Sequence, residues 1–479
     1  MSYDKLIFEI SKKGRRGHDL NIETNNLANL PQQLLREEAL NLPEASEPDV
    51  VRHYTNLSQK NFGVDTGFYP LGSCTMKYNP KINEAIANLP GFHNIHPLTP
   101  PQYAQGALEV IYETDRMLAD VTGMDNFTFA PFAGAHGELV GLWIIKKYHQ
   151  LREDYKRTKI IVPDSAHGTN PASAAVAGFD VIEVKSNPDG TVNIDSLKSV
   201  LSDEIAGIML TNPNTLGIFE PDILTMSKLI HDIGGLLYYD GANLNPLLGV
   251  AKPGMMGFDI IHLNVHKTFS TPHGGGGPGA GPVGVVSHLK DYLPGPVVIK
   301  EDEEYRFLEP KHSIGKVGQF FGNFSVVVKT NAYLKTLGNK IKNLGKLAVL
   351  NTNYLKESLK DDYLLAVDKI CMHEVVFDGL IDKSSGVKTL DIAKRLLDYG
   401  VHPPTIYFPL IVKEAMMIEP VETESKETLD HFIEIMKVIA KEARENPEIV
   451  KSAPHRTVVR RLDEVLAVRK PILKYSDLE

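Results

Sequence analysis

The sequence predicts an α/β protein with a mainly parallel central sheet flanked by helices, followed by a smaller α+β C-terminal domain. The main observation is that short apolar runs alternate with helical patterns from residue 159 to residue 240, which is typical of parallel βαβ units. The glycine content also falls after about residue 330, where charged amphipathic helices dominate. We therefore divide the chain into an N-terminal arm (1–95), a large domain (96–335) and a C-terminal small domain (336–479).

The elements follow from local patterns. Polar segments punctuated by proline fill the arm, so we expect short helices and loops there. A helix follows the double proline at residues 100 and 101, because its apolar residues recur at helical spacing. Another helix begins near Gly134 and Ala135 and carries an apolar stripe. In the small domain we expect a strand around 373–379 and a helix over 389–400.

The composition is that of an ordinary globular enzyme. Hydrophobic residues make up 42% of the chain and charged residues 23%, and the net charge of -9 argues against nucleic acid as the main partner. Cys74 and Cys371 are the two cysteines, so we expect no disulfide framework, no metal site and a reducing compartment. The first residues carry charges where a signal peptide would be apolar, and no apolar run approaches the ~18 residues of a membrane span. We expect a cytoplasmic protein without membrane contact.

Polar residues occupy the carboxyl ends of the predicted strands. His167 follows IIVPDSA, Thr211 and Asn212 follow GIML, and Asp240 follows GLLYY. Lys267 comes after a further apolar run, IIHLNV. Because parallel strands end at the same edge of a sheet, we expect these side chains to converge on one crevice.

Lys267 also precedes an unusual glycine tract, which spans residues 274–281. Such a backbone can approach a flat ligand closely. The tract contains a chance G-x-G-x-x-G, but Pro278 interrupts it and no helical pattern follows, so the dinucleotide fingerprint fails. A Walker loop fails too, because Lys267 and Thr268 come before the glycines instead of after them.

The strand-end residues match what pyridoxal phosphate requires. Lys267 would supply the amine that tethers the cofactor, and Asp240 would keep the ring nitrogen protonated. His167 would stack on the ring, and Asn212 would bind the ring hydroxyl. The alternatives are a turn or cap residue for Asp240 and an ordinary strand-end histidine for His167.

Two further groups complete the expected site. Thr268 and the main-chain N–H groups near Gly134 and Ala135 would hold the phosphate at a helix N-terminus. The loop FYPLGSCTMKYNP offers small hydrogen-bonding groups and a cation for a substrate carboxylate, namely Ser73, Cys74, Thr75 and Lys77. A purely structural loop is the alternative. Cys74 is not expected to be a nucleophile, since nothing nearby lowers its pKa.

Several segments together resemble one family of fold-type I pyridoxal-phosphate enzymes. They are GSCTMKYN, AGAHGE, DSAHGTNPASA, TNPNTLG, YYDGANLN, NVHKTFSTPHGGGGPGAGPVGV and MIEPVETESKETLD, and they run through nearly all the chain. These segments are similar to the glycine decarboxylase P-protein of the glycine cleavage system. The length corresponds to one copy of the fold, so the chain resembles the second, lysine-bearing subunit of the split form.

The resemblance implies a reaction and partners. Glycine would lose its carboxylate as CO2, and the aminomethyl group would pass to the lipoyl arm of the H-protein. A companion first subunit is implied, as a heterotetramer with two of each chain. His266, beside the lysine, is our candidate for proton traffic or lipoyl contact.

Three alternatives remain open from the sequence. A cysteine desulfurase would need a nucleophilic cysteine on a mobile loop, and neither cysteine lies in such a context. An aminotransferase would use an arginine of the small domain for a second carboxylate, and Arg395, Arg456 and Arg460 are candidates. A catalytically silent partner subunit is disfavoured by the presence of both Lys267 and Asp240.

Overall fold

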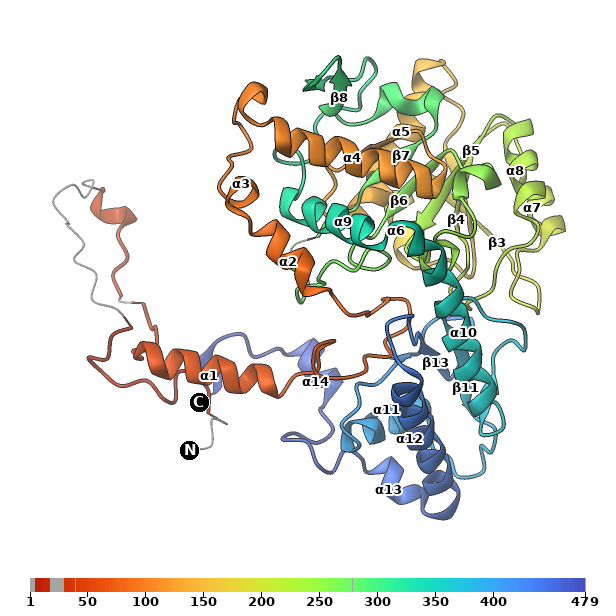
Figure 1. Cartoon of the computed structure of the whole chain (residues 1–479). Coiled ribbons are helices and arrows are strands. Elements are labelled where there is room, and N and C mark those ends of the chain that lie inside the picture. Colours follow the sequence, from red (N-terminus) through yellow and green to blue (C-terminus); the bar gives the residue numbers. More distant parts are fainter. Residues whose placement is uncertain (1–4, 18–29, 39, 278, 479) are drawn as a thin grey trace. The chain divides into compact units, whose positions relative to one another are not determined.

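The computed structural model describes residues 5–17, 30–38, 40–277 and 279–478 (Figure 1). The chain divides into two compact units, Met1–Thr66 with Val459–Glu479, and Gly67–Val458. Residues 67–95, which we expected in the N-terminal arm, belong to the second unit. Leu71 forms a β-bridge with Ile418, and this pairing ties the segment to the C-terminal sheet.

The first unit combines the two ends of the chain. Helix α1 (Glu47–Gln59) begins at a capping box, in which Ser46 and Asp49 satisfy each other's main-chain N–H groups. The unit also contains α14 (Glu464–Arg469) and the short 3-10 helices η1 (Gln32–Leu34) and η7 (Tyr475–Leu478). The ring of Phe8 stacks on Tyr475, with centroids 4.7 Å apart.

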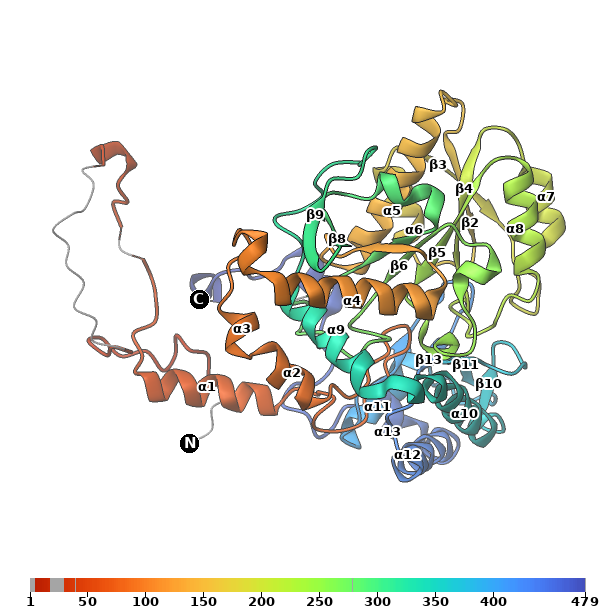
Figure 2. The same ribbon diagram turned by 45° about the horizontal axis from the view of Figure 1, so that its top comes forward.

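A seven-stranded sheet forms the centre of the second unit, in the order β1-β7-β6-β5-β4-β2-β3 (Figure 2). Its strands are β1 (Asn126–Thr128), β2 (Lys159–Pro163), β3 (Asp180–Val184), β4 (Ile205–Thr211), β5 (Leu236–Gly241), β6 (Ile260–Leu263) and β7 (Val283–Val285). β2, β3, β4, β5 and β6 pair in parallel, and β7 runs antiparallel to both of its neighbours, β6 and β1. The predicted mainly parallel sheet is confirmed.

Alternate residues of β2, β4, β5 and β6 enter two different apolar cores, one on each face of this sheet. Tyr239 and Ile261 belong to one core, whereas their neighbours Tyr238 and Ile260 belong to the other. The period of two along a strand produces this separation. Helices α4 (Gln105–Thr122), α8 (Ile223–Asp232) and α9 (Phe324–Leu337) contribute to the first core, and α5 (Gly134–Leu151) and α6 (Thr169–Val176) to the second. The buried strands therefore read as continuous apolar runs.

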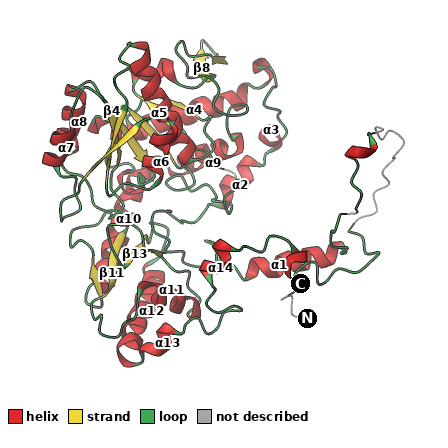
Figure 3. Cartoon of the chain, turned by 180° about the vertical axis from the view of Figure 1, so that it is seen from behind, coloured by secondary structure: helices red, strands yellow, loops and turns green. Residues whose placement is uncertain are grey.

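The C-terminal part of this unit is an antiparallel sheet with helices, as predicted (Figure 3). Its strands lie in the order β10-β11-β13-β12, with bounds Tyr363–Leu365, Val375–Leu380, Ala415–Ile418 and Thr405–Ile406 respectively. The accompanying helices are α10 (Lys342–Leu359), α11 (Thr389–Asp398), α12 (Lys426–Glu445) and α13 (Pro447–Lys451). A separate apolar core lies between these helices and the sheet.

Shorter elements complete the unit. They are α2 (Lys81–Ala87), α3 (Pro90–His93), α7 (Ile194–Val200), the hairpin β8 (Val297–Glu301) and β9 (Glu304–Leu308), and the 3-10 helices η2 (Pro101–Tyr103), η3 (Asn245–Leu247), η4 (Pro253–Met256), η5 (Ser287–Tyr292) and η6 (Gly338–Ile341). Within the described ranges, no helix has both the length and the apolar character needed to cross a bilayer.

Candidate active site

The parallel strands place two of the predicted strand-end residues, Thr211 and Asp240, beside a third residue, His262, which the sequence did not indicate. Thr211, the last residue of β4, pairs in register with Asp240 on β5, and Asp240 pairs with His262 on β6. The polar ends therefore meet at one edge of the sheet, as expected from its topology.

Asp240 is buried at this edge, with 2% of its surface exposed. Its Oδ2 accepts hydrogen bonds from Nδ2 of Asn170 at 3.0 Å and from the hydroxyl of Thr211 at 3.3 Å. Its Oδ1 accepts a bond from the main-chain N–H of Ala242 at 3.0 Å. A buried carboxylate with several donors is held in one orientation, which suits a fixed partner for a ring nitrogen.

Asp240 remains ionised despite its burial. Burial raises its pKa, but the charge of His262, the bonds from Asn170 and Ala242, and the charge of Lys267 lower it, and the net pKa is below the ordinary value. His262 Nε2 lies 3.3 Å from Oδ1 of Asp240. The crevice therefore contains a carboxylate that can pair with a cationic ring.

Lys267 lies in a turn beyond the end of β6. The predicted strand extended to the lysine, but β6 ends at Leu263 and the main-chain N–H of Lys267 donates to the carbonyl of Asn264 at 2.9 Å. The side chain is half-buried. Its positive charge influences the pKa of Asp240, His167 and Cys74, so the amine lies near these groups.

His167 is half-buried and fixed by a chain of hydrogen bonds. Its Nδ1 lies 2.9 Å from Oγ1 of Thr169, and that hydroxyl donates to Oε1 of Glu138 at 2.8 Å. Burial lowers the pKa of His167 below its ordinary value, with Asp240 and Lys267 acting in opposite directions. A neutral, oriented imidazole results, which is the form that stacks on a flat ring without adding charge.

The side-chain nitrogen of Asn212 has no hydrogen-bond partner among the described residues. Its Oδ1 accepts the main-chain N–H of Glu220 at 2.9 Å, whereas Nδ2, although buried, meets no acceptor in the described part of the chain. An unpaired buried donor costs about 1–3 kcal/mol. A ligand oxygen, such as the ring hydroxyl of pyridoxal phosphate, would satisfy it.

The predicted phosphate end also contains a buried polar atom without a partner among the described residues. Helix α5 starts at Gly134, and no side chain among the described residues caps its first N–H groups, which include that of exposed Ala135. The hydroxyl of Thr268 is buried and likewise without a partner among the described residues. A Cβ on Gly134 would lie 2.0 Å from Oδ1 of Asn264. These features fit a phosphate group.

The loop with Ser73, Cys74 and Thr75 lies against two buried carboxylates. The main-chain N–H of Ser73 donates to Glu374 at 2.7 Å, and both the N–H and the hydroxyl of Thr75 donate to Glu419, at 2.8 and 2.6 Å. Ser73 and Thr75 have φ values of 61° and 47°, which are unusual for residues with a side chain. These donors already have partners, so they do not also bind a substrate carboxylate in this conformation.

The amine of Lys77 is bound to side chains of the protein and does not point to a substrate. Its amine donates to Oε1 of Glu422 at 2.7 Å and to Oδ1 of Asn245 at 2.9 Å, and its side chain is fully buried. The predicted cation of the substrate site is thus the partner of an internal carboxylate. Cys74 is partly exposed, and burial raises the pKa of its thiol although Lys267 acts to lower it. This agrees with our expectation that Cys74 is not an activated nucleophile.

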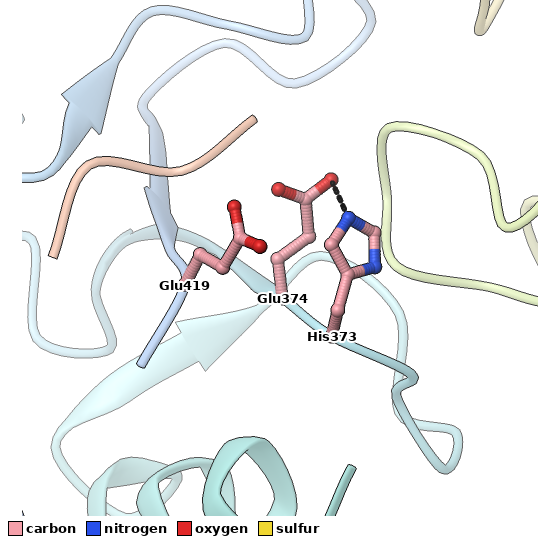
Figure 4. A group of neighbouring side chains, drawn as sticks. All are labelled: His373, Glu374 and Glu419. Atoms are coloured by element: carbon pink, nitrogen blue, oxygen red, sulfur yellow. Dashed lines mark ion pairs between the residues drawn. The ribbon is translucent and has the colours of Figure 1, made fainter. Parts of the chain in front are cut away.

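His373, Glu374 and Glu419 form a buried cluster behind the loop (Figure 4). One candidate ligand atom from each lies within 4.8 Å of the others, and all three residues are fully buried. Burial lowers the pKa of His373 to about 3, so its ring is neutral. The charge of Lys267 influences the pKa of each member, so the cluster lies in the neighbourhood of this lysine.

His266 packs against His273 rather than against the strand ends. Their ring centroids are 4.8 Å apart. Burial, together with the charges of His273, Lys267 and His262, lowers the pKa of His266 to about 3. Burial, together with the charge of Lys267, lowers the pKa of His273 to about 4. Both rings are neutral at pH 7, and the low pKa makes His266 a weak base there.

The candidate arginines of an aminotransferase are engaged elsewhere. Arg395 binds both oxygens of Glu442 and also Asp398, on the helices of the small domain. The guanidinium of Arg456 donates from Nη1 to the main-chain carbonyl of the same Asp398 at 3.5 Å. Arg460 belongs to the first compact unit. The first two positions therefore stabilise the C-terminal helices.

Sequence reasoning missed several residues of the crevice. Asn170, three residues after His167, could have been found from its place in the first turn of a helix that follows a strand. His262 is hidden in an apolar strand, and Glu374 and Glu419 lie at strand ends of a domain that we did not connect with the site. Only the packing of that domain against the loop brings them near Lys267.

Comparisons with known proteins identify relatives along the whole chain. Residues 20–306 match the family described as glycine cleavage system P-protein, and residues 344–460 match the glycine dehydrogenase C-terminal domain. A protein of Caldanaerobacter subterraneus named probable glycine dehydrogenase (decarboxylating) subunit 2 is 62% identical, with 99% of each chain covered. A protein of the same name from Bacillus licheniformis is 57% identical, with 98% of each chain covered.

Solved structures with low sequence identity share the fold. A glycine decarboxylase (P-protein) in inhibitor-bound form superposes with a TM-score of 0.72 at 19% identity, over 86% of this chain and 93% of that one. A cysteine desulfurase from Escherichia coli gives a TM-score of 0.61 at 15% identity, over 81% of this chain and 98% of that one. The predicted fold-type I architecture is confirmed. The chain belongs to the glycine cleavage system P-protein family, among relatives named glycine dehydrogenase (decarboxylating) subunit 2.

Proposed function

We propose that this protein binds pyridoxal 5'-phosphate and decarboxylates glycine, releasing CO2 and transferring the aminomethyl group to the lipoyl arm of the H-protein. The observation that carries the proposal is the buried, ionised Asp240, whose pKa responds to the charge of Lys267. The unpartnered donors of Asn212 and Thr268 support it, since both are buried at places where the cofactor would present oxygen atoms.

When bound, pyridoxal phosphate supplies an aldehyde that reacts with amines and a protonated ring that accepts electrons. Lys267 would hold the aldehyde carbon covalently and give way to the amine of glycine. Asp240 would keep the ring nitrogen protonated through a charge-assisted bond worth about 1.5–3 kcal/mol. His167 would lie on the ring face, and Asn212 would bind the ring hydroxyl.

The phosphate would be held by Thr268 and by the N–H groups of Gly134 and Ala135. The loop with Ser73, Cys74 and Thr75 would wall the substrate end, excluding water while the carboxylate leaves. His266 would accept a proton or contact the lipoyl arm, in keeping with its neutral ring.

The naming of the relatives as a second subunit supports a companion first subunit. We propose a heterotetramer with two of each chain, acting in the cytoplasm on the lipoylated H-protein. Copurification of the coexpressed subunits, with the mass measured by light scattering, tests this assembly.

A spectroscopic experiment tests the cofactor. The purified protein with pyridoxal phosphate should show a visible absorption band that borohydride bleaches, and mass spectrometry should then locate the cofactor on Lys267. Lys267→Ala should lose both the band and the covalent label. An unchanged spectrum in Lys267→Ala would contradict the assignment.

An isotope experiment tests the reaction. With the companion subunit and the H-protein present, the enzyme should exchange labelled bicarbonate into the carboxylate of glycine. A transaminase would instead convert the cofactor to its amine form and show no such exchange.

A further inference from the structure

The loop that follows β4 packs against the segment just before β11. The main-chain N–H of Met372 donates to the carbonyl of Gly217 at 2.7 Å. Gly217 has a φ of 73°, and a Cβ on it would lie 2.0 Å from the carbonyl oxygen of Glu374, so glycine is required for this approach. Side chains of both segments and of β13 share one apolar cluster, namely Leu216, Ile218, Val376, Ala415 and Met417. The small domain is therefore in close contact with the large domain here.

Three buried side chains meet at this junction, namely His373, Glu374 and Glu419 (Figure 4). A bend at residues 372–373 allows the adjacent His373 and Glu374 to present their ends to the same point. Val375 of β11 is in register with Ile418 of β13, so the residues just outside that pair, Glu374 and Glu419, are neighbours. One candidate ligand atom of each side chain lies within 4.8 Å of the other two, and none of the three has exposed surface.

The two carboxylates need a positive partner, because buried charges in proteins are paired or coordinate metals. Among the described residues, neither Glu374 nor Glu419 forms an ion pair with a lysine or an arginine, and the contact in ion-pair range is from Nε2 of His373 to Oε1 of Glu374 at 3.4 Å. The charge of Lys267 influences the pKa of both carboxyls, but its amine is not paired with either in the described chain. A divalent cation would balance both charges.

Two unpaired polar atoms mark where a cation would bind. Nε2 of His373 and Oε1 of Glu374 are buried and have no hydrogen-bond partner within the described ranges. A cation bound to both atoms would satisfy them together, whereas a proton shared by the two carboxyls would leave Nε2 without a partner. Nδ1 of His373 is also unpaired among these residues, but it lies on the side of the ring away from Glu374, so the cation does not account for it (Figure 4).

The spacing of these two atoms fits zinc. Two ligands of a tetrahedral ion with bonds of about 2.0–2.1 Å lie about 3.3–3.4 Å apart, whereas adjacent ligands of an octahedral ion with the same bonds lie about 2.9 Å apart. The observed separation is 3.4 Å. Glu419 can be the third ligand although Thr75 donates to both of its oxygens, because each carboxylate oxygen has a second lone pair.

We infer that His373, Glu374 and Glu419 bind a zinc ion that stabilises the junction between the small domain and the loop after β4. A water completes the tetrahedron. Because Ser73 and Thr75 donate to the two carboxylates, the ion also fixes the 73–75 loop. The ligand set contains no cysteine, so the cysteine count, which led us to expect no metal site, held no information about it. The inference does not depend on the proposed function.

Metal analysis and calorimetry test the site. The purified, tag-free full chain is stripped with a chelator and dialysed against zinc chloride, and wild type should then retain about one zinc ion per chain. Glu374→Gln should bind zinc about a hundredfold more weakly or worse in a calorimetric titration. Glu220→Gln is the matched control and should bind zinc as wild type does, since Glu220 is also buried and accepts main-chain N–H bonds. A wild type that retains no zinc, or equal affinities of wild type and Glu374→Gln, overturns the inference.

Two measurements on wild type decide the matter if Glu374→Gln does not fold. X-ray absorption at the zinc edge should show nitrogen and oxygen ligands at about 2.0–2.1 Å, and a sulfur ligand would overturn the assignment. Zinc chloride added to the stripped protein should raise the midpoint of thermal unfolding, because a ligand that binds the folded state stabilises it. An unchanged midpoint, which a water or a shared proton in the cluster would give, overturns the inference as well.

Discussion

His262 presents Nε2 to Oδ1 of Asp240 at 3.3 Å, while its Nδ1 lies 2.7 Å from the hydroxyl of Tyr238. All three residues are buried. Tyr238 and Asp240 lie on β5, and His262 lies on the neighbouring strand β6. The charge of His262 is the largest of the influences that lower the pKa of Asp240 against its burial. The acid expected at the ring nitrogen thus depends on a histidine from the next strand.

Replacing this histidine should weaken the cofactor site. In His262→Gln the pKa of Asp240 should rise, because the effect of burial then meets less opposition. Once the group titrates near the working pH, each further pKa unit lowers the population of the carboxylate by about tenfold. We expect the affinity for pyridoxal phosphate at pH 7 to fall by about tenfold, measured by absorbance titration. His231→Gln is the control, since His231 pairs with Asp259 at 2.8 Å outside the crevice. Equal affinities in both variants would contradict this dependence.

A methyl group on Gly281 should disturb the start of α5. A Cβ there would lie 2.0 Å from the carbonyl oxygen of Ala133 and 3.0 Å from the nitrogen of Gly134. We expect Gly281→Ala to lower the free energy of unfolding by about 1–3 kcal/mol and to weaken cofactor binding. In Gly106→Ala the new Cβ meets nothing within 4 Å, so that variant should be as stable as wild type or slightly more so in chemical denaturation.

The ion pair of Lys77 and Glu422 should behave as a structural unit. Lys77→Met leaves a buried carboxylate without its counter-charge and should cost about 3–5 kcal/mol, whereas Lys77→Met with Glu422→Leu should recover most of that loss. The free energy of unfolding in urea measures both. A Lys77→Met protein of full stability with reduced affinity for glycine would instead support the substrate role first assigned to this lysine.

The same pair predicts a pH dependence. Burial lowers the pKa of Lys77, but the charges of Glu422 and Tyr333 and the hydrogen bonds to both together raise it by more, so the folded pKa lies above the ordinary value. Stability from this pair is therefore complete below the ordinary lysine pKa of about 10.4 and is lost as the pH rises through the higher folded value. Between pH 7 and pH 10, the free energy of unfolding should therefore not fall because of this pair. The difference in free energy of unfolding between wild type and Lys77→Met should stay constant over this range.

The two cysteines should be slow to react at neutral pH. Burial raises the pKa of Cys74, and burial raises the pKa of Cys371 to about 12. Because the thiolate is the reactive form, iodoacetamide should modify Cys74 slowly at pH 7 and faster as the pH rises, with Cys371 slower throughout. Peptide mass spectrometry measures both rates. Lys267→Ala should slow Cys74 further, since the lysine charge acts to lower its pKa, and rapid labelling of Cys74 at pH 7 would contradict the assignment.

Sequence by itself determined the central sheet and the residues at its edge. Alternating apolar runs and helices dictate parallel strands, and parallel strands present their final residues together, so His167, Asn212 and Asp240 could be grouped without coordinates. Lys267 and the glycine tract followed from the same reasoning, although the strand before the lysine is shorter than expected.

Tertiary structure alone decided which side chains have partners. Lys77 reads as a free cation in the sequence, but folding places it beside Glu422. The acids Glu374 and Glu419 become neighbours only because β11 and β13 pair, and the 73–75 loop donates hydrogen bonds to them. Periodicity reports which face of an element is buried, whereas charge pairing depends on contacts between segments hundreds of residues apart. For this reason the residues at the edge of the central sheet were visible in the sequence, and the buried pair Glu374 and Glu419 was not.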